Sequence, residues 1–404
     1  MNDEITNIPK IRFKGYTEDW EQRKFKEFSK KTGKKNTKDL DFPAYSVSNK
    51  AGLISQTEQF DGSRLDDLEK TNYKFVEPNE FAYNPARINV GSIAFNNLGM
   101  TVIVSSLYVV VKMSEDLDNE FILQFIKSPT FIKEVKRNTE GSVREYLFYE
   151  NFANIKFPFT RNKEEQKKIG TFFKQLDDTI ALHQRELDLL RKIKQTYLQK
   201  MFPKTGEDRP EIRFAGFTEP WEQRKFKEFS KKTGKKNTKD LDFPAYSVSN
   251  KAGLISQTEQ FDGSRLDDLE KTNYKFVEPN EFAYNPARIN VGSIAFNNLG
   301  MTVIVSSLYV VVKMSEDLDN EFILQFIKSP TFIKEVKRNT EGSVREYLFY
   351  ENFANIKFPF TRNKEEQKKI GTFFKQLDDT IALHQRNLNV LKEMKKSLLQ
   401  QMFV

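Results

Sequence analysis

Residues 162–201, NKEEQKKIGTFFKQLDDTIALHQRELDLLRKIKQTYLQKM, have the pattern of one long helix. Asn162 suits the N-cap of this helix, and Glu165, three residues on, suits the position that closes a capping box. Beyond the cap, apolar residues alternate by four and three, which is the heptad spacing of a helix that packs along another helix. We name this stripe the seam. All of its ten positions except His183 and Lys194 are apolar. The seam residues are Ile169, Phe173, Leu176, Ile180, His183, Leu187, Leu190, Lys194, Tyr197 and Met201.

Polar residues in and beside the seam have structural interpretations. His183 and its counterpart His384 have no second histidine or cysteine near them in the sequence, so we expect no metal site. A polar side chain at a single seam position instead fixes the register of paired helices. The adjacent carboxylates Asp177 and Asp178 are interpreted as a solvated or partner-facing edge of the helix.

The helix belongs to a tandem duplication. Residues 20–185 recur without a change as residues 221–386, at an offset of 201 positions. Solenoid repeats have periods of about 20 to 50 residues, so a copy of this length is a domain with a connector. The predicted organisation is a domain and a connector helix, twice, at residues 1–160, 161–203, 204–361 and 362–404.

Each copy begins with a stretch rich in predicted strands. Runs of β-branched and aromatic residues predict strands at 41–48, 73–76, 81–83, 101–104 and 107–112, and helical spacing predicts helices at 119–127 and 130–135. The fold class is therefore α+β, with two globular domains separated by two long helices. We expect these helices to pack together within the chain as an antiparallel coiled coil with pseudo-two-fold symmetry. A homodimer seam and a docking face for another protein are the alternatives.

Composition narrows the function classes. The 404 residues carry a formal charge of +8 and no cysteine, which removes disulfides, thiolate nucleophiles and cysteine-ligated zinc. No run of 18 apolar residues and no signal-peptide pattern is present, so we expect a cytoplasmic protein without a membrane partner. The modest positive charge is compatible with nucleic acid but fits solubility alone as well.

The motifs predict no catalysis by this chain. The sequence lacks the phosphate-binding patterns GxGxxG and GxxxxGK[ST] and the GxSxG nucleophile turn. Residues 84–87, NPAR, begin like the NPPY element with which amino-methyltransferases hold a flipped adenine, but they lack its second proline and its aromatic ring. We therefore predict no catalytic residue, no bound cofactor and no metal ligand.

Lysines crowd one predicted loop in each copy. Residues 29–38 contain five lysines and no acid, a composition that suits contact with DNA phosphates. Lysines that are simply solvated are an equal alternative. The predicted phosphate contacts are Lys30, Lys31, Lys34, Lys35, Lys231, Lys232, Lys235 and Lys236.

Side chains able to contact base edges cluster in or beside the predicted loops. Asparagine suits adenine and arginine suits guanine in the major groove. Phe81, Tyr83 and Phe95, by contrast, are expected in the core. The predicted base contacts are Ser48, Asn49, Lys50, Asn84, Arg87, Asn96, Asn97, Ser142 and Arg144, with Asn89 beside them, and in the second copy Ser249, Asn250, Lys251, Asn285, Arg288, Asn297, Asn298, Ser343 and Arg345.

The order of these pieces is similar to that of a known family. WEQRKF at residues 20–25 resembles the entry to its recognition domain, and FVEPNEFAYNPAR at 75–87 resembles a strand–turn–strand segment of that domain. Residues 140–158 are similar to the stretch before its connector helix, and residues 162–180 to the start of that helix. Present twice over essentially the whole chain, this order resembles the specificity subunit of type I restriction-modification systems.

The resemblance implies a division of labour. Such a subunit binds double-stranded DNA through two target-recognition domains, each for one half of a bipartite target. Two modification subunits carry S-adenosylmethionine and the adenine N6-methyltransferase site, and two restriction subunits, where present, add a DNA-translocating nuclease. The connector helices would set the spacing of the half-sites and offer the surface on which the modification subunits assemble.

Identical domains are a departure from the family pattern, whose members commonly carry two different ones. Identical domains must prefer the same half-site, and antiparallel helices relate them by a pseudo-two-fold axis, so we predict an interrupted palindrome. We expect half-site centres about one helical turn apart, which is roughly ten base pairs. With half-sites of about three or four pairs, this leaves about five to seven unspecified pairs between them. A stand-alone palindrome-binding repressor and a coiled-coil scaffold without a DNA role are the alternatives that the sequence leaves open.

Overall fold

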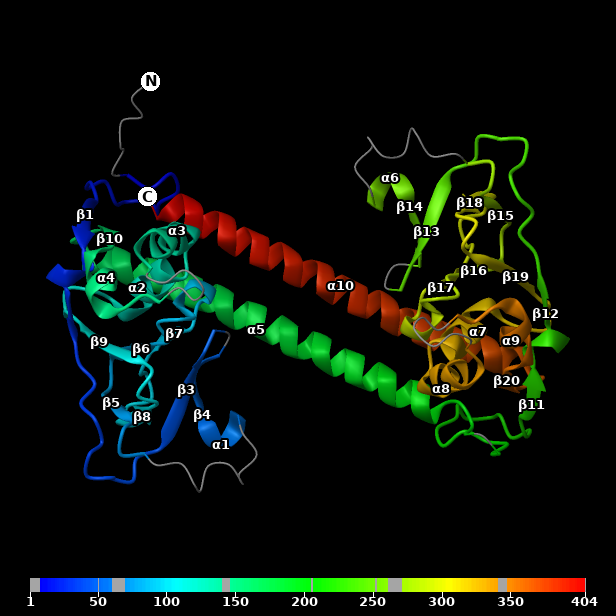
Figure 1. Ribbon diagram of the computed structural model, residues 1–404, viewed down its shortest axis with the longest axis horizontal. Helices are drawn as coiled ribbons and strands as arrows, with labels where there is room; N and C mark the ends of the chain where they lie inside the picture. The colour runs from blue at the N-terminus through cyan, green and yellow to red at the C-terminus, as the bar shows by residue number, and fades with distance from the viewer. Residues whose placement is uncertain are drawn as a thin grey trace. The chain divides into compact units, whose positions relative to one another are not determined.

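The chain divides into two compact units. Unit 1 comprises residues 1–184 and 386–404, and unit 2 comprises residues 185–385. Each unit therefore contains one globular domain and one part of each long helix (Figure 1). The computed structural model describes residues 8–49, 51–59, 70–139, 146–204, 206–250, 253–260, 271–340 and 347–403.

The described strands of unit 1 form two four-stranded sheets and one two-stranded sheet. The first sheet, β2-β9-β6-β7, is antiparallel throughout, and the second, β4-β3-β8-β5, contains one parallel pair, β3 with β8. In the third, β1 pairs with β10. The strands are β1 (Glu21–Lys24), β2 (Ser29–Lys31), β3 (Ala44–Ser48), β4 (Gly52–Ser55), β5 (Lys74–Val76), β6 (Glu80–Tyr83), β7 (Ile93–Phe95), β8 (Val102–Val104), β9 (Val109–Met113) and β10 (Lys156–Phe159).

Short helices surround these sheets. The two predicted helices are confirmed as α2 and α3: Asp118 caps α2 by accepting from the backbone N–H of Phe121 at 2.9 Å, and Ser128 caps α3 by accepting from that of Phe131 at 3.2 Å. Pro129 occupies the first position of α3, where its missing N–H costs nothing. The helical elements are η1 (Phe25–Glu27), α1 (Gln56–Gln59), η3 (Ile88–Val90), α2 (Asn119–Ile126), α3 (Pro129–Asn138), α4 (Tyr149–Asn154) and α5 (Lys163–Lys200).

Unit 2 repeats this architecture with the same strand orders, β12-β19-β16-β17, β14-β13-β18-β15 and β11-β20. The α+β fold class is thus confirmed. Its elements are β11 (Glu222–Lys225), η4 (Phe226–Glu228), β12 (Ser230–Lys232), β13 (Ala245–Ser249), β14 (Gly253–Ser256), α6 (Gln257–Gln260), β15 (Lys275–Val277), β16 (Glu281–Tyr284), η6 (Ile289–Val291), β17 (Ile294–Phe296), β18 (Val303–Val305), β19 (Val310–Met314), α7 (Asn320–Ile327), α8 (Pro330–Asn339), α9 (Tyr350–Asn355), β20 (Lys357–Phe360) and α10 (Lys364–Met402).

Aromatic side chains fill the core of each unit. In unit 1, Phe25 stacks on Phe152 and on Phe157 with ring centroids 4.5 and 4.6 Å apart. Phe81 and Tyr83 are fully buried as predicted, and the half-buried Phe95 packs against the same cluster. Burial of so many large rings provides most of the hydrophobic stabilisation that holds the sheets against the helices.

The start of α5 is confirmed at its cap but not in its capping box. Asn162 Oδ1 accepts from the backbone N–H of Glu165 at 3.1 Å. The Glu165 carboxylate is fully buried and accepts two hydrogen bonds from Arg12, at 2.6 and 2.9 Å. It also accepts from Trp20 Nε1 and from the Thr160 hydroxyl. Because Glu165 is committed to the ion pair with Arg12, the prediction that it reaches back to the cap was wrong.

Within each unit the two helix segments run antiparallel, as predicted. In unit 1, Lys395 Nζ lies 2.6 Å from Asp177 Oδ1, and Lys392 Nζ donates to Gln184 Oε1. Residue numbers rise along one helix as they fall along the other, which defines the direction. Asp177 and Asp178 were interpreted as a solvated or partner-facing edge. The solvated alternative is wrong for Asp177, whose carboxylate pairs with Lys395 and also accepts from Gln124 Nε2 at 3.1 Å, whereas Asp178 is exposed.

Unit 2 holds the equivalent ion pair between the two helix segments. Lys194 Nζ lies 2.5 Å from Asp378 Oδ1, and only 14% of the lysine side chain is exposed. Burial lowers the pKa of Lys395 in unit 1, while the Asp177 carboxylate opposes that shift. An ion pair whose lysine is largely buried favours the register of the two helices that keeps its partners together.

The end of each long helix completes a globular core. In unit 1, Phe403 is 1% exposed and its ring lies 5.4 Å from that of Phe121 and 5.6 Å from that of Phe125. Figure 1 shows the C-terminus beside the helices of this unit. In unit 2, Phe202 takes the same place against Phe322 and Phe326. Residues 386–403 are thus part of the core that residues 8–184 begin.

Replacing Phe403 by alanine should destabilise unit 1 by about 3 to 5 kcal/mol, because it leaves a cavity between rings. The chain has two tryptophans, Trp20 in unit 1 and Trp221 in unit 2, so a Trp221→Phe background reports unit 1 alone. Urea unfolding followed by Trp20 fluorescence measures the change.

The control is Val390→Ala in the same background, since Val390 belongs to the same part of α10 and is 65% exposed. It should shift the free energy of unfolding by less than about 0.5 kcal/mol. If Phe403→Ala shifts it no more than this control, the helix end is not part of the core.

Candidate nucleic-acid interface

Unit 2 has a surface pocket with a volume of about 1010 Å³, lined by residues from both of its four-stranded sheets. Among the described residues that line it, three are cationic and none is acidic. We name it the basic pocket. Its lining residues are Lys232, Lys275, Asn285, Pro286, Ala287, Arg288, Asn290, Ser307, Leu308, Tyr309, Val310, Tyr347 and Phe349.

Arg288 is presented to the pocket by a hydrogen-bonded turn after β16. Asn285 Oδ1 accepts from the backbone N–H of Ala287 at 3.0 Å, and the Arg288 N–H donates to the Asn285 carbonyl at 3.0 Å. Ile289, the next residue, is buried and starts η6, which ends at Gly292 in the left-handed conformation with φ 84°. An exposed arginine between such anchors points outward from a rigid base.

A second turn, between β18 and β19, brings Leu308 and Tyr309 to the pocket. Both flanking strands are runs of buried valine and isoleucine, which leaves the connection at the surface. The Tyr309 hydroxyl accepts from the backbone N–H of Val248 at 3.2 Å, and its carbonyl accepts from Lys275 Nζ at 2.6 Å. These bonds hold the turn at both ends of Tyr309.

An aromatic pair forms another side of the pocket. The rings of Tyr347 and Phe349 stack at 5.8 Å with an interplanar angle of 6°. Leu348 between them is fully buried, and its N–H donates to the carbonyl of Pro286 at 3.0 Å. Because the core holds Leu348, the alternating rings are on the outer side, where Phe349 is 44% exposed.

The charges of the pocket are mutually repulsive. Burial lowers the pKa of Lys275, and the positive charges of Lys232 and Lys236 lower it further. Glu351 is the carboxylate that pairs with Lys232, at 3.5 Å, and both side chains are largely exposed. A cluster of cations that disfavour one another is stabilised by an anionic ligand such as a phosphate backbone.

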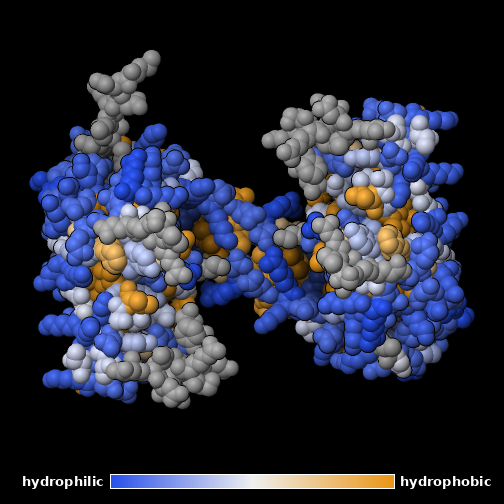
Figure 2. Space-filling model, in the orientation of Figure 1, coloured by the Kyte–Doolittle hydropathy of each residue, from blue (hydrophilic) through white to orange (hydrophobic). Residues whose placement is uncertain are grey.

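Unit 1 presents the same side chains. Leu107 is 73% exposed, as Leu308 is, and the Tyr146 and Phe148 rings stack at 5.8 Å. Lys74 Nζ donates to the Tyr108 carbonyl at 2.6 Å, and Lys31 lies 3.5 Å from Glu150. Elsewhere, on the face shown in Figure 2, small hydrophobic patches interrupt a mostly hydrophilic surface.

Part of the predicted set meets at this pocket. Lys232, Asn285 and Arg288 line it, and their counterparts in unit 1 are Lys31, Asn84 and Arg87. Lys30 and Lys31 lie in β2 rather than in a loop, with Lys30 opposite Lys112 of β9, so the loop prediction was wrong for them and for Lys231 and Lys232 in β12. The polar run SKK pairs as an edge strand because β9 offers it hydrogen bonds.

Asn96 and Asn297 are not base contacts, and that prediction was wrong. Both are fully buried. Asn96 Nδ2 donates to the carbonyls of Val76 and Met100, at 2.9 and 2.8 Å, and its Oδ1 accepts from the Leu98 N–H at 3.0 Å. A side chain that satisfies buried backbone groups in this way holds a loop together.

The other predicted contacts are distributed over the surface. Asn49, Asn97, Asn250, Asn298, Lys34, Lys35, Lys235 and Lys236 are exposed, and Ser48 and Ser249 are half-buried at strand ends. Lys50, Lys251, Ser142, Arg144, Ser343 and Arg345 lie outside the described residues.

Most residues that line the basic pocket were not predicted from the sequence. The structure adds Lys275, Leu308, Tyr347 and Phe349, with counterparts in unit 1. Their signals were present but ambiguous: SSLY is a turn between two β-branched runs, and YLF alternates in the manner of a half-buried segment.

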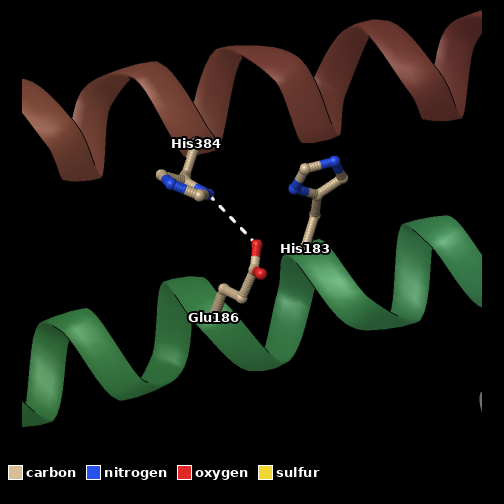
Figure 3. Close-up of side chains that lie close together, drawn as sticks. All are labelled: His183, Glu186 and His384. Atoms are coloured by element: carbon tan, nitrogen blue, oxygen red, sulfur yellow. Dashed lines mark ion pairs between the residues drawn. The ribbon is translucent and has the colours of Figure 1, made fainter.

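In unit 2 a histidine and a glutamate lie close together between the two helix segments. His384 Nδ1 lies 3.5 Å from Glu186 Oε2, and the two half-exposed side chains come from α10 and α5 (Figure 3). His183, also shown there, is a half-buried residue of α5 that belongs to unit 1.

In the described part of the chain, none of the helices has the length and apolar character that crossing a membrane requires.

These features define a class of protein: a pair of α+β domains that present the same cationic side chains, which line a pocket in unit 2, each domain being joined to antiparallel segments of two long helices. The family model of the type I restriction modification DNA specificity domain matches residues 17–192 and again residues 218–393. The protein therefore belongs to the type I restriction-modification DNA specificity family.

Known relatives agree with this assignment. The chain is 24% identical over 328 residues to the type I restriction enzyme MjaVIII specificity subunit of Methanocaldococcus jannaschii, covering 77% of this chain and 75% of the relative. Its fold is similar to the S subunit of a type I restriction-modification system from M. genitalium, with a TM-score of 0.64, 14% identity and coverage of 98% and 99% of the two chains. It is also similar to a structure from a study of complex assembly in a type I R-M system, with a TM-score of 0.51, 12% identity and coverage of 95% of this chain and 97% of the other.

Removing Lys232 of the basic pocket together with its unit 1 counterpart Lys31 should reduce the salt dependence of DNA binding. For Lys31→Gln with Lys232→Gln, the slope of log affinity against log salt should fall in magnitude by about 2, roughly 0.9 for each lost phosphate contact. Fluorescence anisotropy with a mixed-sequence duplex at several salt concentrations gives the slope.

The matched control is Lys167→Gln with Lys368→Gln, which removes two exposed lysines from the first turns of α5 and α10. An equal loss of slope in this control would mean that net charge, rather than the pocket, binds the backbone.

Proposed function

We propose that this chain selects an interrupted palindromic DNA target and directs adenine N6 methylation of it by two modification subunits, which bring S-adenosylmethionine and the catalytic site. Two restriction subunits join where they are present. The protein acts in the cytoplasm, where its DNA and its partners are. This chain contributes recognition and assembly, and no catalytic step.

The observation that carries the proposal is the identity of the pocket side chains in the two units. Lys232, Arg288 and Leu308 of unit 2 have the counterparts Lys31, Arg87 and Leu107 in unit 1, within a block that is duplicated without a change. Two copies of one recognition surface prefer the same half-site. A palindrome offers that half-site twice in inverted orientation, which suits two domains related by a two-fold axis.

Exposed apolar residues on the long helices support an assembly role. In unit 1, Leu182 of α5 is 49% exposed and Val390 of α10 is 65% exposed. In unit 2, Leu189 is 58% and Leu383 is 50% exposed. Large apolar side chains on the outer face of a helix that already has a partner suit contact with a further protein. These side chains are our candidates for contact with the modification subunits.

Cells that express this chain with its modification subunit should contain N6-methyladenine at one interrupted palindrome. The half-sites should be identical in inverted orientation, because the recognition surfaces are identical. Single-molecule sequencing of genomic DNA identifies both the motif and the methylated adenines. Cells that lack either protein serve as the control.

Two different half-sites in the methylated motif would contradict the symmetry argument but keep the family function. Identical half-sites in direct orientation would contradict the two-fold relation alone. A chain that binds a palindrome tightly without any modification subunit, and yields no methylation with one, would instead be a stand-alone repressor.

Lengthening both connector helices should lengthen the spacer of the target. Duplication of residues 184–190 in α5 and 385–391 in α10 adds one heptad, about 10 Å at 1.5 Å per residue, which keeps the seam in phase. The methylated motif should then gain about three unspecified base pairs, at roughly 3.4 Å each. Duplication in only one helix is the control and should abolish methylation. A motif with an unchanged spacer would show that the helices do not set the spacing.

A further inference from the structure

Leu308 and its counterpart Leu107 are the most exposed large hydrophobic side chains in the described part of the chain. Each is 73% exposed. Leu308 lies in the wall of the basic pocket beside Lys275 and Tyr309. Single exposed leucines are common on protein surfaces, so the exposure alone carries no conclusion. Its surroundings decide what it means.

The turn that carries Leu308 is held in place. The carbonyl of Tyr309 accepts from Lys275 Nζ, and the Tyr309 hydroxyl accepts from the N–H of Val248. The Tyr309 N–H closes the turn onto the Ser306 carbonyl at 3.1 Å. Because these bonds fix the residue next to it, the side chain of Leu308 stays exposed to water. This exposure costs the fold the hydrophobic free energy that burial of the leucine would provide.

A second apolar group lies in the same pocket. Phe349 is 44% exposed and stacks on Tyr347, while buried Leu348 holds the segment to the core. Cations line the rest of the pocket: Lys232, Lys275 and Arg288. The ligand that fits this lining is polyanionic at its rim and apolar at the point that faces Leu308 and Phe349.

Double-stranded DNA has one apolar group of this kind on its base edges. Base faces are hidden by stacking, and the edges in both grooves otherwise present hydrogen-bond donors and acceptors. The exception is the 5-methyl group of thymine, which lies in the major groove within reach of the flanking phosphates. An apolar side chain framed by phosphate-binding cations is therefore matched to a thymine.

We propose that Leu107 and Leu308, each supported by the neighbouring aromatic pair, contact the 5-methyl group of a thymine in each half-site and so determine part of the target specificity. The pocket cations hold the phosphates and carry little sequence information. This inference rests on the proposed function, because it needs a DNA target.

The test uses the full chain with its modification subunit and a synthetic duplex that carries the methylated motif. Each half-site thymine is replaced in turn by deoxyuridine, which removes the methyl group and leaves the base pair intact. At one position per half-site, affinity should fall about fourfold, the effect of one buried methyl group. Replacement in both half-sites should weaken binding about fifteenfold, because distant sites add.

The same duplexes are then bound by the variant Leu107→Ala with Leu308→Ala. This variant should bind thymine and deoxyuridine targets equally, and its salt slope should remain that of the unaltered chain. The control is Leu98→Ala with Leu299→Ala, which shortens exposed leucines that do not line the basic pocket. The control should keep the full preference for thymine.

The outcomes separate the two claims. If the unaltered chain binds every deoxyuridine duplex as tightly as the thymine duplex, the inference is wrong while the proposed function stands. If the leucine variant keeps the thymine preference, another residue contacts the methyl group and the inference is again wrong. If the unaltered complex shows no preference for the motif over unrelated DNA, the proposed function fails and the inference with it.

Discussion

The core of unit 1 is completed by residues from the far end of the sequence. Phe403 lies among Trp20, Phe121, Phe125 and Phe173, and the Lys395–Asp177 ion pair sets the register in which α10 reaches that place. Unit 2 depends in the same way on Phe202 and Lys194 of α5. Helix pairing and domain folding are therefore one event in each unit: a helix that shifted by one turn would withdraw a phenylalanine from a close-packed core.

This dependence gives the recognition surface a rigid base. Of the strands that carry the basic pocket, β16 and β19 pack on the aromatic core that the helix end closes, and β15 and β18 pack in an adjoining cluster of valine and alanine side chains. Loops positioned by such a scaffold hold side chains with little conformational entropy left to lose on binding. Within the pocket, burial and neighbouring lysines lower the pKa of Lys275, so the cationic lining favours a polyanion, and exposed Leu308 and Phe349 offer apolar contact. In the function that we propose, affinity and selectivity thus come from different side chains of one surface.

Prediction from the sequence succeeded where a pattern was long or strongly apolar. The heptad seam, the N-cap at Asn162 and the β-branched strands β8 and β9 were found because their signals do not depend on distant residues. The strands β1, β2 and β10 were missed because EQRK and SKK are polar and KFPF contains a proline; each exists through pairing with a distant strand. Asn96 and Asp177 were misplaced for the same reason, since burial and ion pairing arise only in the folded chain.

The amino-acid sequence by itself determined the duplication, the α+β class and the helix seam, since these follow from identity and periodicity along the chain, and the order of its motifs carried the resemblance to the family. Tertiary structure alone decided which lysines and asparagines share a pocket, that Leu308 stays in water beside them, and that each core is closed by a helix end from elsewhere in the sequence. The physical reason is that a pocket and a core are made by segments that meet only after β-pairing and helix packing, whereas periodicity is a property of neighbours.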